Sequence, residues 1–271
     1  MDTGNGRVLS ELTFPVKWKN RLSGFKSYGL CLTNKNEAAV ALSNKVQFFN
    51  IEGESLNMGT VLTLNHDSSL DISTCGDRDL VVSYNKAPWL EVISPDGSVL
   101  HQIRQNGTTS HFKCPGFLTT SVDGYIYVSD RGTDEITKLN SSLQLLQTFS
   151  NRLLSAPRGI ISISPDQLLV CSCCPNSIVL LNTSSGKSSI LLGKQYGSYM
   201  YMTPFSSLDP WTVMSSILLG DQDEIKRPIC LSYSPEQEKL YVNGSGRLNV
   251  YKLSKCGSDE YKIYLKHNLH F

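Results

Sequence analysis

The side chains with the most obvious chemistry are three closely spaced cysteines, Cys171, Cys173 and Cys174. Thiolates bind zinc, but a structural zinc site takes four ligands, usually from two closely spaced pairs. No histidine lies near this segment in the sequence. In a strand, Cys171 and Cys173 would share one face and Cys174 would point to the other. We therefore expect packed core thiols here, and neither a metal nor a cofactor.

Two other segments imitate ligand-binding loops. Gly186-Lys187-Ser188 resembles the end of a phosphate-binding loop, but that loop needs a glycine at position 181, which is leucine. Asp221, Asp223 and Glu224 resemble part of a calcium loop, but Lys226 occupies the place of the required glycine. The sequence therefore predicts a hairpin turn at the first segment and a solvated acidic loop at the second.

Catalytic constellations are equally absent from the sequence pattern. The five histidines are scattered, and there is no Gly-x-Ser-x-Gly motif to mark a nucleophile. Asp130 closes an apolar segment, where a carboxylate commonly accepts hydrogen bonds from nearby backbone amides. We therefore expect Asp130 to act structurally and the chain not to be an enzyme.

Composition narrows the classes of partner. Lys and Arg number 25 and Asp and Glu 24, so no global field attracts nucleic acid or an anionic membrane. No run of 18 apolar residues could cross a membrane, and residues 1–14 lack the pattern of a secretory signal. Eight cysteines are far too few for a disulfide scaffold. We expect a cytoplasmic chain with reduced thiols, no membrane association, no small-molecule substrate, and a single domain over residues 1–271.

The elements that must position any site are repeated. Five segments share an order of short apolar strands and polar turns, with Asp123-Gly124 as the clearest hairpin signal. These segments span residues 28–51, 70–103, 115–149, 157–192 and 228–253. Residues 8–14, or their extension to residue 18, and residues 261–267 add a possible edge strand at each end. The chain is therefore predicted to be nearly all β.

The valine of the second strand in each segment measures the repeat. These valines are separated by 42, 46, 42 and 72 residues, and are Val40, Val82, Val128, Val170 and Val242. A four-stranded propeller blade takes about 40–45 residues, so the first three steps fit. The hexamer SSILLG occurs at residues 188–193 and again at 215–220. We therefore interpret residues 194–220 as an insertion between the fourth and fifth repeats.

The repeats resemble those of a known family. The segments GYIYVSD at 124–130, PRGI at 157–160 and PICLSY at 228–233 are similar to NHL-type propeller repeats. They resemble most closely the C-terminal propellers of tripartite-motif-like (B-box zinc-finger) proteins of invertebrates, over roughly residues 8–255. The five visible repeats and the two edge strands allow either a five-bladed ring or a six-bladed ring that lacks most of one blade. The resemblance implies six four-stranded blades, with the first truncated here. It also implies that any ubiquitin ligase activity would belong to RING and B-box domains outside these residues.

Binding is expected on one set of loops. Loops between second and third strands and loops between blades share one face of a propeller, and loops on a rigid scaffold usually carry binding. Trp and Arg are over-represented among binding hot spots. On that face we predict a binding set of five residues: Lys86, Trp89, Arg131, Arg158 and Arg227.

Three functions compete as interpretations of the sequence. A protein-interaction module, selecting substrates for a ligase of the tripartite-motif-like family, fits the loops and the resemblance. RNA binding is an alternative, although it usually needs a concentrated basic patch. A metal-dependent propeller hydrolase needs acidic residues where the inner strands begin. None of those positions is acidic here; they are Tyr28, Leu70, Pro115, Arg158 and Pro228.

Overall fold

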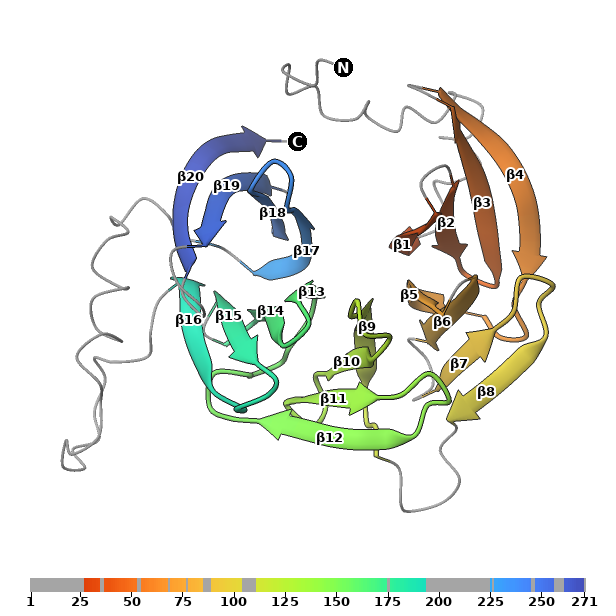
Figure 1. The fold of residues 1–271 in the computed structure, drawn as a ribbon, viewed down its shortest axis with the longest axis horizontal. Helices are drawn as coiled ribbons and strands as arrows, with labels where there is room; N and C mark the ends of the chain where they lie inside the picture. Colours follow the sequence, from red (N-terminus) through yellow and green to blue (C-terminus); the bar gives the residue numbers. More distant parts are fainter. Residues whose placement is uncertain are drawn as a thin grey trace.

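The computed structural model describes five antiparallel sheets of four strands each. The described residues are 27–34, 37–52, 55–67, 69–76, 78–84, 89–103, 111–174, 176–193, 225, 227–244, 247–255 and 261–270. Every element within these ranges is a strand, so none of them holds a helix able to cross a membrane. Each sheet follows chain order from an inner to an outer strand, and together the sheets form the blades of a five-bladed β-propeller (Figure 1).

The strands of each blade have the following bounds. Blade 1 contains β1 (Ser27–Asn34), β2 (Glu37–Leu42), β3 (Lys45–Glu52) and β4 (Ser55–Thr63). Blade 2 contains β5 (Ser69–Cys75), β6 (Asp79–Tyr84), β7 (Leu90–Ile93) and β8 (Val99–Ile103). Blade 3 contains β9 (Pro115–Thr120), β10 (Ile126–Asp130), β11 (Glu135–Leu139) and β12 (Leu145–Ser150). Blade 4 contains β13 (Ile160–Ser164), β14 (Gln167–Ser172), β15 (Ser177–Asn182) and β16 (Ser188–Gly193). Blade 5 contains β17 (Pro228–Ser234), β18 (Lys239–Gly244), β19 (Arg247–Lys255) and β20 (Tyr261–His270).

The predicted repeat is confirmed at Val40, Val82, Val128, Val170 and Val242, which we call the ruler valines. All five valines lie on the second strand of a blade and are buried. In blades 2 to 5 the ruler valine belongs to the core shared with the preceding blade. The strands alternate faces residue by residue, so the neighbours of each valine point to the opposite face of the sheet. One blade therefore contributes two apolar faces.

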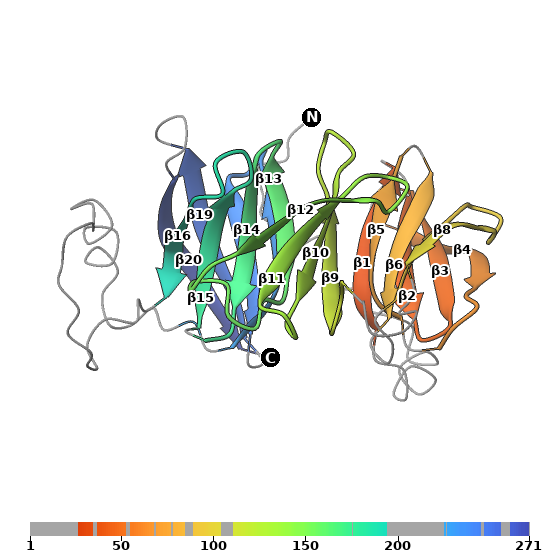
Figure 2. The ribbon, with the colours of Figure 1, turned by 90° about the horizontal axis from the view of Figure 1, so that it is seen from below.

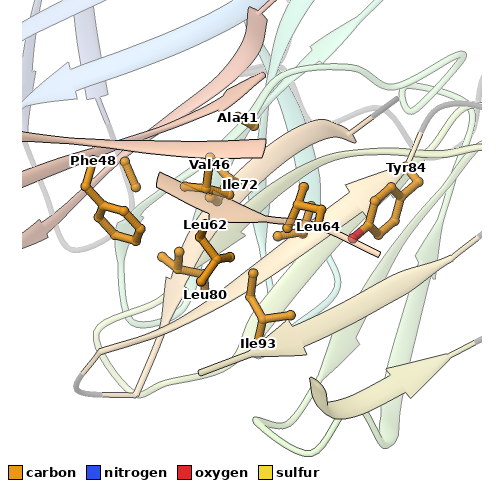
Figure 3. Close-up of a cluster of buried hydrophobic side chains, with 11 residues drawn as sticks. Ala41, Val46, Phe48, Leu62, Leu64, Ile72, Leu80, Tyr84 and Ile93 are labelled. Atoms are coloured by element: carbon orange, nitrogen blue, oxygen red, sulfur yellow. The ribbon is translucent and has the colours of Figure 1, made fainter. Parts of the chain in front are cut away.

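Four apolar clusters join consecutive blades. The first packs side chains of β2, β3 and β4 against side chains of β5, β6 and β7, and Figure 3 shows Leu62 at its middle, between Phe48 and Leu64. The other three join blades 2 and 3, 3 and 4, and 4 and 5. Within the described ranges no such cluster joins blade 5 to blade 1, and Figure 1 shows the ribbons of these blades separated there.

The tight turns follow the glycine signals. Gly124 has a φ of 80°, which glycine adopts without steric cost, and its N–H donates to the carbonyl oxygen of Ser121 at 2.9 Å. Gly186 has a φ of 70° and its N–H donates to the carbonyl oxygen of Asn182 at 2.9 Å. Both predicted hairpin turns are therefore confirmed. Figure 2 shows the strands running across the thickness of the ring, so that turns and loops gather at its two faces.

Of the predicted end strands and the predicted insertion, only the C-terminal strand lies within the described residues. The C-terminal strand was expected as an edge strand beyond the fifth repeat, but β20 is the fourth strand of blade 5. The predicted edge strand at residues 8–14, the insertion at 194–220 and the acidic loop at 221–224 lie outside the described residues.

Candidate functional site

Two sets of loops form one face, which we call the loop face. Backbone hydrogen bonds join loops between blades to turns between second and third strands, as between the Ser69 N–H and the Ser43 carbonyl oxygen (2.8 Å). The Cys173 N–H likewise donates to the Ser155 carbonyl oxygen (2.9 Å). The described part of the loop face consists of residues 43–44, 64–67, 89, 111–114, 131–134, 151–159, 173–174, 176, 225 and 227.

Asp130 fixes one sector of the loop face. Its carboxylate is fully buried and accepts hydrogen bonds from the backbone N–H groups of Lys113 (2.7 Å), Cys114 (2.9 Å) and Gly132 (2.7 Å). Two of these donors lie in the loop that enters blade 3, and the third lies in the turn after β10. The structural role predicted for Asp130 is therefore confirmed.

Arg131 is held at the tip of this sector. Its backbone N–H donates to the carbonyl oxygen of Cys114 at 3.3 Å, and its Nε donates to the Cys114 Sγ at 2.9 Å. A Cβ on the following Gly132 would lie 2.7 Å from the Cβ of Lys113, so only glycine fits there. The Arg131 side chain is exposed and its guanidinium makes no ion pair with any described carboxylate. A partner could therefore reach it.

Trp89 makes an edge contact with a neighbouring loop. Its ring centroid lies 4.2 Å from that of His66, at an interplanar angle of 64°, and its side chain packs against the core between blades 1 and 2. The Trp89 side chain is half-buried, so only part of its surface is open to a partner.

A buried carboxylate supports this aromatic pair. The Glu91 side chain is fully buried, and its Oε2 accepts a hydrogen bond from the Tyr84 hydroxyl at 2.8 Å. Its Oε1 lies 3.3 Å from His66 Nε2. The Glu91 carboxylate therefore lies against the imidazole whose ring Trp89 contacts.

Arg158 lies where the loop from blade 3 enters β13. Its N–H donates to the carbonyl oxygen of Cys171 at 2.9 Å, while its half-buried side chain leaves Nε buried and without a described hydrogen-bond partner. Burial raises the pKa of Cys230 to about 11, and the nearby charge of Asp71 adds to this, while the Arg158 charge opposes it. The guanidinium of Arg158 thus lies near the inner strands of blades 4 and 5 and has no described carboxylate to neutralise it.

The remaining predicted residues differ in what the structure describes. Arg227 is exposed and has a φ of 47°; its N–H donates to Asn176 Oδ1 at 3.1 Å, across the loop face. Lys86 lies outside the described residues. Trp89, Arg131, Arg158 and Arg227 share the loop face, but no described hydrogen bond or ion pair joins one of these side chains to another.

Asp71 is a site residue that sequence reasoning missed. It lies on β5, one residue after Leu70, and its carboxylate is buried. Its Oδ1 accepts from the Ile72 N–H (2.9 Å) and its Oδ2 from the Leu118 N–H of β9 (2.8 Å). Burial raises its pKa to about 7, although the two amide hydrogen bonds oppose this. The sequence signal that could have identified it is an aspartate between two apolar residues of a predicted strand.

The cysteine cluster is only partly a core feature. Cys171 is fully buried, but Cys173 is half-buried and Cys174 is exposed, so the expectation of packed thiols holds for the first cysteine alone. The strand ends at Ser172, which leaves the other two cysteines in the following turn. Within the described part of the chain, no three His, Cys, Asp or Glu side chains are grouped so that they could hold a metal ion.

Comparisons with known proteins bear on the fold. No protein-family model matches the chain, and no curated protein matches its sequence. A functionally unknown protein from Desulfotomaculum acetoxidans DSM 771 has a similar structure, with a TM-score of 0.58 and 12% identity over 90% of this chain and 70% of its own.

Two lyase structures are also similar. A streptogramin B lyase aligns with a TM-score of 0.54 and 13% identity over 89% of this chain and 83% of its own. The virginiamycin B lyase from Staphylococcus aureus aligns with a TM-score of 0.53 and 14% identity over 88% of this chain and 83% of its own. At such low identities the shared property is the architecture, and this chain is a β-propeller.

Proposed function

We propose that this chain is a non-catalytic protein-recognition module whose loop face binds an acidic segment of a partner protein. The observation that carries the proposal is the set of arginines on that face, Arg131, Arg158 and Arg227, which no described carboxylate neutralises. The arginine guanidinium presents a rigid fork of donors that matches a carboxylate, and arginine is enriched at binding hot spots. Trp89, whose ring contacts that of His66 edge to face, adds an apolar surface on the same loop face.

The repeats support a more specific role. Their similarity to NHL repeats of tripartite-motif-like proteins leads us to propose that the module selects substrates for a ubiquitin ligase. The catalytic RING and B-box parts of such a ligase would be separate from the propeller. A rigid loop face suits substrate selection, because preorganised side chains lose little conformational entropy on binding.

A binding assay with defined probes tests the proposal. Fluorescent peptides from an acidic library and a single-stranded RNA of mixed sequence would be titrated with the full chain, and anisotropy would give each affinity. We expect an acidic peptide to bind, and Arg131→Ala to weaken it by about 2 kcal/mol, roughly thirtyfold. Lys187→Ala is the matched control, because Lys187 is an exposed cation in the turn between β15 and β16, on the opposite face.

Three outcomes would contradict the proposal. Tighter binding of RNA than of any acidic peptide, lost in Arg131→Ala and Arg227→Ala, would favour an RNA-binding propeller. Equal affinity in the wild type and both arginine variants would exclude the loop face. A loss in Lys187→Ala alone would place the site on the opposite face.

A further inference from the structure

One face of blade 1 is apolar across all four strands, and none of the described blades packs against it. Directly paired residues of antiparallel strands project their side chains to the same face. The register of β1 to β4 aligns two such rows, which are Leu30, Val40, Gln47 and Val61, and Leu32, Ala38, Phe49 and Met58. We call these eight residues the seam face. The opposite face of the same sheet packs against blade 2.

Gln47, the polar member of the seam face, is buried and uses its side-chain amide within blade 1. The Gln47 Nε2 donates to the carbonyl oxygens of Phe48 (2.8 Å), Gly59 (3.2 Å) and Thr60 (3.2 Å). The side chain is buried, and its amide group satisfies the irregular backbone where β3 pairs with β4. The seam face therefore presents an apolar surface to whatever lies against it.

Equivalent positions in the other blades show what is missing. Each ruler valine pairs with an inner-strand residue, and in blades 2, 3 and 4 these partners are Ile72, Leu118 and Ile160, with exposures of 2%, 5% and 3%. The partner in blade 1, Leu30, is 52% exposed. The preceding blade covers the first three residues, and no described residue covers Leu30 to that extent.

The seam face has other exposed members. Leu32, Met58 and Val61 have exposures of 61%, 51% and 52%. Large apolar side chains that cluster in this way on a soluble protein usually mark a surface that binds something.

Blade 5 offers a mixed surface rather than an apolar one. The face of blade 5 turned away from blade 4 includes Ser232, Tyr241 and Asn243 on β17 and β18, and, on β19, Val250 and Leu248, which pair with the last two. Ser232 and Asn243 are exposed polar residues. Asn243 directly follows the ruler valine of blade 5. The equivalent residue in blade 4 is Cys171, which is buried. A segment that filled the space beside blade 1 would therefore need an apolar side for the seam face, and its other side would meet the polar residues of β17 and β18.

We propose that the seam face binds residues 12–18 of this same chain as an extended strand. In that segment Leu12, Phe14, Val16 and Trp18 alternate with Thr13, Pro15 and Lys17, which gives a strand one apolar and one polar side. The apolar side would pack on the seam face, and the polar side would turn toward blade 5. The segment itself lies outside the described residues.

The chain can make this connection. Only eight residues, 19–26, separate the segment from the start of β1 at Ser27. Extended chain spans about 3.3 Å per residue, so the connector reaches about 26 Å, enough to return along blade 1. Proline at position 15 removes one backbone donor, which a strand with a free edge tolerates.

Cross-linking of the full chain tests the proposal. A benzophenone side chain would be placed at position 32 on the seam face, and the cross-linked peptides would be identified by mass spectrometry after irradiation. We expect an intramolecular cross-link to residues 12–18. The same group at position 145, an exposed leucine on β12 of blade 3, is the control and should not reach that segment.

A matched pair of variants separates packing from general damage to the fold. Phe14→Asp places a charge on the apolar side of the segment and Thr13→Asp places it on the polar side. We expect Phe14→Asp to abolish the cross-link and to increase binding of an apolar dye, and Thr13→Asp to preserve the wild-type result. Cross-links between two chains, cross-links only to blade 5, or equal behaviour of the two variants would each overturn the proposal.

Discussion

The Oδ2 atom of Asp71 on β5 accepts a hydrogen bond from the backbone N–H of Leu118 on β9, at 2.8 Å, and so joins the inner strands of blades 2 and 3. Ser83 makes a second link between these blades. Its Oγ accepts from the Asp71 N–H at 3.2 Å and donates to the carbonyl oxygen of Gly116 at 2.6 Å. Polar contacts near the ring centre therefore supplement the apolar core between these two blades.

The buried Asp71 carboxyl makes stability depend on pH. Its pKa is raised to about 7 in the folded state, above the value of about 3.9 for an unfolded chain. Between these values the folded chain keeps a proton that the unfolded chain has lost, so raising the pH favours unfolding. The contribution of Asp71 to the free energy of unfolding should fall by up to about 1.4 kcal/mol per pH unit from about pH 4 to 7, and then stay constant.

Urea unfolding of Asp71→Asn measures this contribution. The variant should lose the Asp71 part of the slope between pH 4 and 7, while Asp123→Asn, an exposed carboxylate in a turn of blade 3, should keep it. If Asp71→Asn and wild type have parallel pH profiles, the carboxyl titrates equally in the folded and unfolded states.

Gly159 should be intolerant of any side chain. Its N–H donates to the Ile229 carbonyl oxygen at 2.8 Å, and an added Cβ would lie 2.8 Å from the Cys230 Cα of β17. Backbone cannot move aside as a flexible side chain can, so Gly159→Ala should cost about 1–3 kcal/mol of stability. At Gly116 the nearest atom to an added Cβ is 3.6 Å away, so Gly116→Ala should change stability by less than about 1 kcal/mol. Equal denaturation midpoints for the two variants would contradict the close approach of β13 and β17.

Loss of the Asp130 carboxylate should loosen the Arg131 sector. Asp130→Ala leaves three backbone N–H groups without their acceptor, and each unsatisfied buried group costs about 1–3 kcal/mol unless water replaces it. We expect a loss of at least about 2 kcal/mol in denaturant unfolding and faster hydrogen exchange at residues 113, 114 and 132.

Asp134 supplies the matched control for that experiment. Its exposed carboxylate accepts a single described hydrogen bond, from the Ala156 N–H at 2.7 Å. Asp134→Ala should therefore lower the free energy of unfolding by less. An equal decrease in both variants would show that the three hydrogen bonds to Asp130 stabilise the fold no more than the single one to Asp134.

Deletion of residues 194–220 tests the insertion hypothesis. β16 ends at Gly193, and the first described residue afterwards, Ile225, is buried in the core between blades 4 and 5. The deletion leaves Ile225 and the strands around it unchanged, and doubling a loop costs only about 0.6 kcal/mol. We expect a soluble chain whose stability changes by about 1 kcal/mol or less. An insoluble product, or a much lower melting temperature in calorimetry, would show that the insertion belongs to the core.

Sequence patterns predicted the features that depend on local order. The spacing of Val82, Val128 and Val170 predicted the blades, because a buried second strand recurs once per repeat. Gly124 predicted its turn because a φ of 80° suits glycine, and Asp130 predicted its role because a strand end leaves amides that need an acceptor.

Contacts between distant residues could not be predicted in this way. Asp71 accepts a hydrogen bond from Leu118, which follows it by 47 residues, and it lies one residue after the strand-opening position Leu70. Glu91 and His66 meet only because two blades are adjacent, and neither residue has a local motif that announces its partner. The same holds for Arg158. Its Nε atom is buried without a described hydrogen-bond partner because of the residues that the fold brings around it from elsewhere in the sequence.

The break between blades 5 and 1 gives the described molecule two ends. Four apolar clusters hold five blades, so blades 2, 3 and 4 are buttressed on both sides and blades 1 and 5 on one. Such an array behaves like a short one-dimensional stack, in which stability is a sum over neighbours and opening starts at a terminus. The described fold is therefore expected to fray from its outermost sheets inward, with blade 3 the last to open.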